Sequence, residues 1–174
     1  MFVLASVIIV PQNFAATSSG GFSFSRPDVL GMPYYEPMMW GFYSVNIKRW
    51  TYGQRDVCAT FSKRNVVAFL ATGLIFALFS YDSLLLTLSS SALVLLLFFW
   101  FHDKSDLATA SYALFMGMVV ELFGVHTGQW SYPSPVMLGL PLWSVSMWLS
   151  VGILLNRFLV PVSAKLAKAL HFEP

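Results

Sequence analysis

The chain has 174 residues, of which 57% are hydrophobic and 10% are charged, and its mean hydropathy is +0.68. Soluble domains carry roughly 25% charged residues, so this composition excludes an ordinary water-soluble domain and indicates a membrane protein. The formal net charge of +2 is too small for a nucleic-acid-binding surface, and we expect no nucleic-acid partner.

The residue types that bind metals and cofactors do not cluster in the sequence. Cys58 is the single cysteine, and His102, His126 and His171 are far apart, so no metal site is expected. The chain has no glycine-rich phosphate-binding loop and no visible internal repeat. No cofactor is therefore predicted.

The N-terminal third differs in composition from the rest of the chain. Residues 1–10 (MFVLASVIIV) are apolar but too short to span a membrane. They are the core of a signal peptide, an interfacial segment, or the end of a longer span. Repeated glycine and proline predict mostly irregular structure up to residue 62, with a short interfacial helix over about 37–52. We therefore assign residues 1–62 to an interfacial, mostly irregular segment.

Four apolar segments follow, at about 66–81, 84–101, 107–125 and 140–160. Asp82 is placed to cap the second of these helices, and Pro161 is expected to end the fourth. The sequence thus predicts an all-α polytopic transmembrane bundle of about four spans over residues 63–161. Residues 162–174 form an amphipathic C-terminal tail, in which Lys165 and Lys168 lie along the membrane surface.

The basic residues predict the orientation of the chain. In a four-span arrangement all ten fall on one face: Arg26, Lys48, Arg49, Arg55, Lys63, Arg64, Lys104, Arg157, Lys165 and Lys168. The positive-inside rule then places both termini in the cytoplasm. The expected location is the cell membrane, which is the inner membrane if the protein is bacterial.

Glu121 is an acidic residue inside the third predicted span. Ala110, Ala113, Gly117 and Gly124 share its helical face, and small residues mark close helix approach in membranes. Glu121 is therefore expected to face the bundle interior. No Lys or Arg falls on that side of the membrane, so a neutral, proton-donating carboxyl group is expected there. The alternative is a glutamic acid that joins two helices by a hydrogen bond.

The loop after Glu121 supplies candidate partners for this carboxyl group. His126 titrates in the range suited to proton relay and is a candidate catalytic residue together with Glu121. Gln129, Trp130, Tyr132 and Trp148 are candidate substrate-binding residues. The aromatic members alternatively form a membrane-interface belt, which is the expected role of Trp143.

A second aromatic stretch surrounds Glu36 in the N-terminal segment. Tyr35, Glu36 and Trp40 are candidate partner-binding residues, because aromatic and methionine side chains are enriched at protein interfaces. A second functional site is the alternative.

Part of the chain resembles the carotenoid-biosynthesis membrane protein family, which includes hydratases acting on long polyenes. The resemblance covers about residues 121–150 and rests on Glu121-x-x-Gly124-x-x-Thr127-Gly128-x-Trp130-x-Tyr132, on Gly139-x-Pro141-Leu142 and on Trp148. The chain has Gln129-Trp130 where a longer aromatic-glycine insertion is usual in that family. The resemblance implies an apolar isoprenoid or another membrane lipid as substrate.

Two functional hypotheses follow from these patterns. In the first, the protein is an enzyme of hydratase or cyclase type in which Glu121 protonates an isoprenoid double bond. Aromatic faces then stabilise the resulting cation. In the second, it is a non-catalytic accessory subunit of a larger membrane protein complex.

Overall fold

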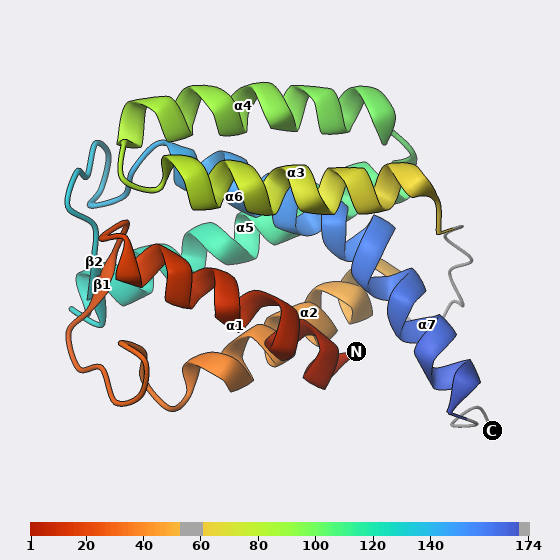
Figure 1. Ribbon diagram of the computed structural model, residues 1–174, viewed down its shortest axis with the longest axis horizontal. Helices are drawn as coiled ribbons and strands as arrows, with labels where there is room; N and C mark the ends of the chain where they lie inside the picture. The colour runs from red at the N-terminus through yellow and green to blue at the C-terminus, as the bar shows by residue number, and fades with distance from the viewer. Residues whose placement is uncertain (53–60, 171–174) are drawn as a thin grey trace.

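The computed structural model describes residues 1–52 and 61–170. Arg55, Cys58 and His171 lie outside the described residues. The elements in chain order are α1 (Phe2–Ser18), β1 (Ser23–Phe24), α2 (Glu36–Tyr52), α3 (Lys63–Phe79), α4 (Ser83–Trp100), α5 (Lys104–His126), β2 (Trp130–Ser131), α6 (Trp143–Leu154), the π-helical segment η1 (Leu155–Leu159) and α7 (Val160–Ala169). Figure 1 shows the long helices running back and forth side by side. This arrangement confirms the predicted all-α polytopic bundle.

Within residues 1–52 and 61–170, three helices are long and apolar enough to cross a membrane: α4, α5 and the continuous helix Trp143–Ala169. Helix α3 coincides with the first predicted span and has 17 residues. The predicted N-terminal cap of α4 is confirmed, because the Asp82 side chain accepts hydrogen bonds from the backbone N–H groups of Leu84 and Leu85, both at 3.0 Å.

The N-terminal segment is more regular than its composition predicts. Residues 2–10 are the first part of α1, which continues through Pro11. Proline is tolerated in membrane helices because neighbouring groups satisfy the backbone that it leaves free. The helix expected over 37–52 exists as α2, but it packs against α1 and α5 within the bundle. The prediction that residues 1–62 are mostly irregular is therefore wrong for these two helices.

Pro161 does not end the last span, contrary to the prediction. The helix continues through η1 into α7, with Pro161 in the first turn of α7. Proline has no N–H, so the carbonyl four residues earlier loses its usual helical partner. That carbonyl belongs to Arg157, and it accepts a hydrogen bond from Nδ2 of Asn65 on α3. A neighbouring helix thus satisfies the group that the proline leaves free.

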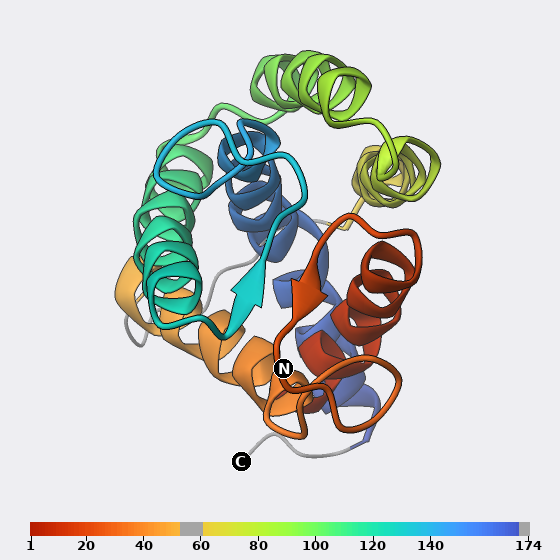
Figure 2. The ribbon, with the colours of Figure 1, turned by 90° about the vertical axis from the view of Figure 1, so that its left-hand side faces the viewer.

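The two strands pair at one end of the bundle, as Figure 2 shows. They are antiparallel, with Ser23 opposite Ser131 and Phe24 opposite Trp130. The loop that carries Arg26 follows β1 and lies at this end, whereas α2 and α3 present their basic residues at the other end. The prediction that all ten basic residues share one face is wrong for Arg26, because α1 carries the chain across the bundle first.

The structure reveals an internal repeat that the sequence analysis missed. Ser23 and Ser131, paired across the strands, are 108 residues apart. The same spacing separates the last residues of α1 and α5 and relates two matching turns. Each turn has a leucine and a glycine at positive φ inside a short β-bridge: Leu30, Gly31, Leu138 and Gly139. The units α1–β1–α2 and α5–β2–α6 are thus built alike.

The two units are related by an approximate twofold rotation whose axis runs along the bundle. Equivalent residues that touch each other lie on such an axis. Ser23 and Ser131 do so at the strand end, where their Oγ atoms are 3.2 Å apart. Deeper in the bundle, Trp40 and Trp148 are also 108 positions apart, and their rings stack at 5.5 Å with an interplanar angle of 21°. Helices α3 and α4 connect the two units and have no such counterpart among the described residues.

Candidate functional site

A large apolar cavity lies between the two units, beneath the paired strands. Its volume is about 1370 Å³, counted out to its open side. Side chains of α1, α2, α3, α5 and α6 line it, together with Phe22, Phe24, Trp130 and Tyr132 from the strand region. Ligand sites in proteins are typically apolar cavities with a few convergent polar groups. Here the convergent groups are the carboxylates of Glu36 and Glu121.

Glu121 accepts three hydrogen bonds from aromatic side chains. Its Oε2 accepts from Nε1 of Trp130 at 2.9 Å and from the hydroxyl of Tyr132 at 2.6 Å. Its Oε1 accepts from Nε1 of Trp148 at 3.2 Å. All three donors are neutral. The carboxyl group is therefore an acceptor held in a fixed orientation.

The predicted small-residue face of α5 explains why these aromatic rings reach Glu121. Gly117 and Gly124 are buried, and a Cβ atom on either would overlap an indole ring, that of Trp148 at Gly117 and that of Trp130 at Gly124. Because glycine has no side chain, these two positions leave the space in which both indoles lie against α5. The prediction that Glu121 faces the bundle interior is confirmed, since its exposed fraction is 6%.

Glu36 forms a second acidic centre in the same cavity. Its Oε1 accepts hydrogen bonds from Nδ2 of Asn13 on α1 and from Nε1 of Trp40, one turn further along α2, at 2.8 Å. Asn13 is the position in α1 that corresponds to Glu121 in α5, at the common spacing of 108 residues. Each unit therefore contributes one carboxylate, although from different helices.

The two acidic centres flank the twofold axis. Trp40 holds Glu36 and Trp148 holds Glu121, and these two indoles stack on each other. Tyr43 packs edge-on against both rings. The carboxylates consequently occupy related positions on either side of one aromatic pair.

The surroundings of the acidic groups contain no compensating positive charge. Among the described residues that line the cavity, none is lysine, arginine or histidine. Burial and the nearby negative charge of Glu121 raise the pKa of Tyr132, in the connection between α5 and α6, well above its ordinary value of 10. Tyr132 therefore remains a neutral hydrogen-bond donor to Glu121 at physiological pH.

The cavity brings together some of the residues that the sequence singled out. Trp130 and Tyr132 contact Glu121, as the sequence predicted, and Trp148, predicted only as a substrate-binding residue, contacts it as well. His126 is exposed, and its Nδ1 lies 2.8 Å from the carbonyl oxygen of Leu122, so the structure does not place it beside Glu121. Gln129 is also exposed and accepts a hydrogen bond from the hydroxyl of Tyr35 at 3.1 Å.

The N-terminal aromatic stretch divides between surface and cavity. Tyr35 is 39% exposed, whereas Glu36 and Trp40 are only 6% and 7% exposed. The last two therefore lie inside the bundle and are not available for docking in this structure. Trp143, expected in an interfacial belt, is buried as well and contacts Tyr132 edge-on at 5.5 Å.

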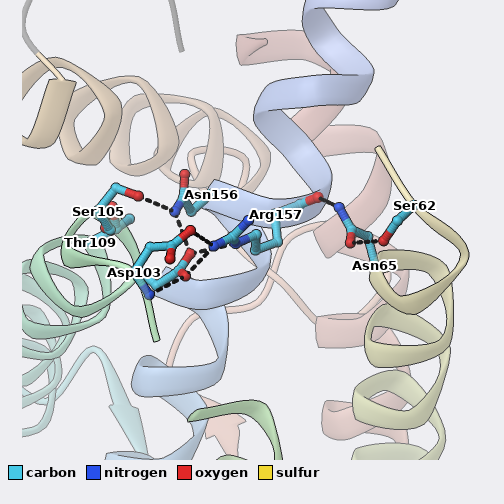
Figure 3. Close-up of polar contacts among 8 residues, drawn as sticks. Ser62, Asn65, Asp103, Ser105, Thr109, Asn156 and Arg157 are labelled. Atoms are coloured by element: carbon cyan, nitrogen blue, oxygen red, sulfur yellow. Dashed lines mark hydrogen bonds and ion pairs between the residues drawn. The ribbon is translucent and has the colours of Figure 1, made fainter. Parts of the chain in front are cut away.

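A separate polar cluster lies at the other end of the bundle (Figure 3). Arg157 in η1 donates to both carboxylate oxygens of Asp106 and pairs with Asp103 at 2.5 Å. Asn156 donates to Asp106 at 2.6 Å and so joins the last span to α5. Asp106 is fully buried at the start of α5. The cluster fastens the π-helical segment to α5 and lies outside the cavity.

The cavity reaches the surface where two of its lining residues are exposed or partly exposed, Gln12 on α1 and Gly73 on α3, so we place its mouth between these helices. A Cβ atom at Gly73 would meet no atom within 4 Å. This glycine therefore leaves open space at the mouth and is not needed for close packing.

The fold and the site define a class: a multi-pass helical membrane protein with an acidic, aromatic-walled internal cavity. The family model described as "Protein of unknown function (DUF817)" matches residues 43–169, and the chain belongs to this family. A search of curated proteins finds no significant match.

Two crystal structures share the fold. One is of MvINS, a mycobacterial Insig homologue from Mycobacterium vanbaalenii, and the other is of a cross-linked MvINS trimer. Both have a TM-score of 0.79 and cover 94% of this chain and 92% of the other, at 15% and 14% sequence identity respectively. At this identity the likeness establishes an Insig-like fold and nothing about the ligand.

Proposed function

We propose that the protein binds a membrane lipid with a long apolar part and a hydrogen-bond-donating head group in the cavity between its two units. The observation that carries the proposal is the pair of buried carboxylates in a mostly apolar cavity. Carboxylate oxygens accept hydrogen bonds, so the complementary group on the ligand is a hydroxyl or an amine. Free fatty acids and phosphate head groups are disfavoured by charge repulsion.

The mouth supports entry of the ligand from the bilayer. It lies between α1 and α3, beside the exposed apolar side chains of Leu70 and Leu74 on α3. An apolar ligand entering sideways from the bilayer would not have to cross water. An isoprenoid, the substrate class that the local resemblance implies, fits these requirements if it carries a hydroxyl group.

Protonation of an isoprenoid double bond is a second candidate function. It is favoured by the position of Glu121 in the cavity wall beside three aromatic side chains. Glu121 would give its proton to one carbon of the double bond, and water would add to the resulting cation and return a proton to the carboxylate. Both oxygens of Glu121 already accept hydrogen bonds from neutral donors, so we place binding ahead of catalysis.

An accessory role in a larger complex, with both termini in the cytoplasm, is compatible with this function. Of the described basic residues, all but Arg26 belong to the end opposite the strands, and the positive-inside rule assigns that end to the cytoplasm. The neighbouring structure of a cross-linked MvINS trimer motivates a search for oligomers. The mass of the purified particle tests for copies or partners.

Purification in mild detergent, followed by extraction and mass spectrometry of bound lipid, tests the proposed function. The wild-type protein should retain one lipid class that carries a hydroxyl or amine group. Gly73→Leu should lose it, because the new side chain fills the mouth without a backbone clash. Ala77→Leu, at an exposed position on the same helix, is the matched control and should retain the lipid. Equal lipid content in all three proteins would refute the proposal.

A further inference from the structure

We infer that the head group bound in this cavity is positively charged: a long-chain amine held between Glu36 and Glu121 against the stacked indoles of Trp40 and Trp148. This inference rests on the proposed function and narrows its ligand class. It follows from the position of the two carboxylates, their hydrogen-bond partners and the lack of a cation among the described lining residues.

The twofold arrangement places both acids beside the same pair of indole rings. The two stacked indoles point their N–H groups at different carboxylates, that of Trp40 at Glu36 and that of Trp148 at Glu121. Both carboxylates line the same cavity, beside the same pair of stacked indoles, so a single head group against these rings can contact both acids.

The hydrogen bonds hold both acids as acceptors. Glu121 accepts from three neutral donors, and Glu36 accepts from Asn13 and Trp40. Hydrogen bonds donated to a carboxylate stabilise its ionised form and burial opposes ionisation, so a bound cation would tip the balance toward two ionised carboxylates. Both described bonds to Glu36 fall on Oε1, so Oε2 is the oxygen offered to a ligand.

The described residues that line the cavity do not compensate the charge of two carboxylates. Two carboxylates close together in apolar surroundings repel each other, and each loses hydration energy. The described lining residues supply no lysine, arginine or histidine to offset this cost. An ammonium group supplies the missing charge, whereas a hydroxyl group supplies only a hydrogen bond.

The aromatic walls favour the same ligand. A cation over the face of tryptophan or tyrosine is attracted by the ring, and the attraction is larger when the site is shielded from water. Trp40 and Trp148 are 7% and 2% exposed, so this site is largely shielded. Carboxylates combined with aromatic faces distinguish an amine from an alcohol with the same chain.

The test compares octadecylamine with octadecanol, which share one chain and differ in the head group. Binding to the purified full-length protein in mild detergent is measured by tryptophan fluorescence and checked by native mass spectrometry. We expect the amine to bind roughly tenfold or more tightly than the alcohol. Glu36→Gln and Glu121→Gln should each reduce this preference while alcohol binding persists. Asp82→Asn, at an acid outside the cavity, should leave the preference unchanged.

The outcomes separate this inference from the proposed function. Equal affinity for amine and alcohol in the wild-type protein, with binding blocked by Gly73→Leu, would overturn the inference and leave lipid binding intact. A preference that survives both glutamine substitutions would also overturn it. Failure of both ligands to bind would refute the proposed function itself. Should Glu121→Gln fail to fold, the comparison of Glu36→Gln with Asp82→Asn decides the question.

Discussion

Removing the acceptor at Glu121 should destabilise the protein in proportion to the donors left without a partner. In Glu121→Gln one oxygen remains and can still accept from Trp130 and Tyr132, while the new amide N–H group faces the indole N–H of Trp148. One buried donor without a partner costs about 1–3 kcal/mol. In Glu121→Ala all three donors lose their acceptor, and three such costs sum to roughly 3–9 kcal/mol as an upper limit. That is comparable to the whole stability of many proteins, about 5–15 kcal/mol.

Unfolding in mixed micelles of mild detergent and SDS, followed by near-ultraviolet circular dichroism, measures these differences. The predicted order of stability is wild type, then Glu121→Gln, then Glu121→Ala. Trp148→Phe removes the donor that conflicts with the glutamine, so the double variant Glu121→Gln/Trp148→Phe should lose less stability than the two single losses combined. Strictly additive losses, or an alanine variant as stable as the glutamine variant, would refute the assigned hydrogen bonds.

Three further predictions concern packing, the polar cluster and pH. Gly117→Ala should lower stability by about 1–3 kcal/mol or more in the same unfolding assay, because its Cβ would overlap an indole ring. Arg157→Met should lower the free energy of unfolding by about 3–5 kcal/mol, because it leaves the fully buried Asp106 carboxylate without its cation. Asp103→Asn changes a side chain that is 69% exposed and should lower it by less than about 1 kcal/mol. Because the pKa of Tyr132 is raised in the folded protein, the folded protein keeps a proton that the tyrosine in the unfolded chain loses above its ordinary pKa of 10. Stability should therefore fall as pH rises above about 10, and Tyr132→Phe should weaken that dependence.

The helices of the second half could be predicted because their signals are local. Apolar runs located α3, α4, α5 and α6, and the small residues around Glu121 correctly oriented its side chain toward the interior. Helical periodicity fixes which residues share a face, and small side chains allow close approach. Trp130 and Tyr132 were identified as partners of Glu121 from their proximity in the sequence, whereas Trp148, 27 residues away, was predicted only as a substrate-binding residue.

The prediction was wrong for the first half of the chain because the structure there depends on contacts between residues far apart in the sequence. The apolar start of α1 reads as too short when Pro11 is taken as its end. Glu36 and Trp40 looked like surface residues because nothing local shows that α1 and α5 enclose them. Their position in the cavity becomes visible only when the second unit, α5–β2–α6, is packed against them.

The internal repeat was missed for a similar reason. Few positions keep the same residue, and the clearest are Leu30-Gly31 with Leu138-Gly139, Pro33 with Pro141, and Trp40 with Trp148. A comparison of these short matches at one constant spacing would have revealed it. The glycines are shared because each turn requires positive φ, a backbone conformation that other residues seldom adopt.

The central claim is that the cavity between the two units holds the ligand, and photo-crosslinking tests it most directly. A photoreactive long-chain amine or alcohol is bound to the detergent-purified protein, and the labelled residues are mapped by mass spectrometry. The account predicts labels on cavity residues such as Phe69, Phe76 and Met147, and their loss in Gly73→Leu. Labels confined to outward-facing residues of α4, such as Leu95 and Phe99, would contradict it.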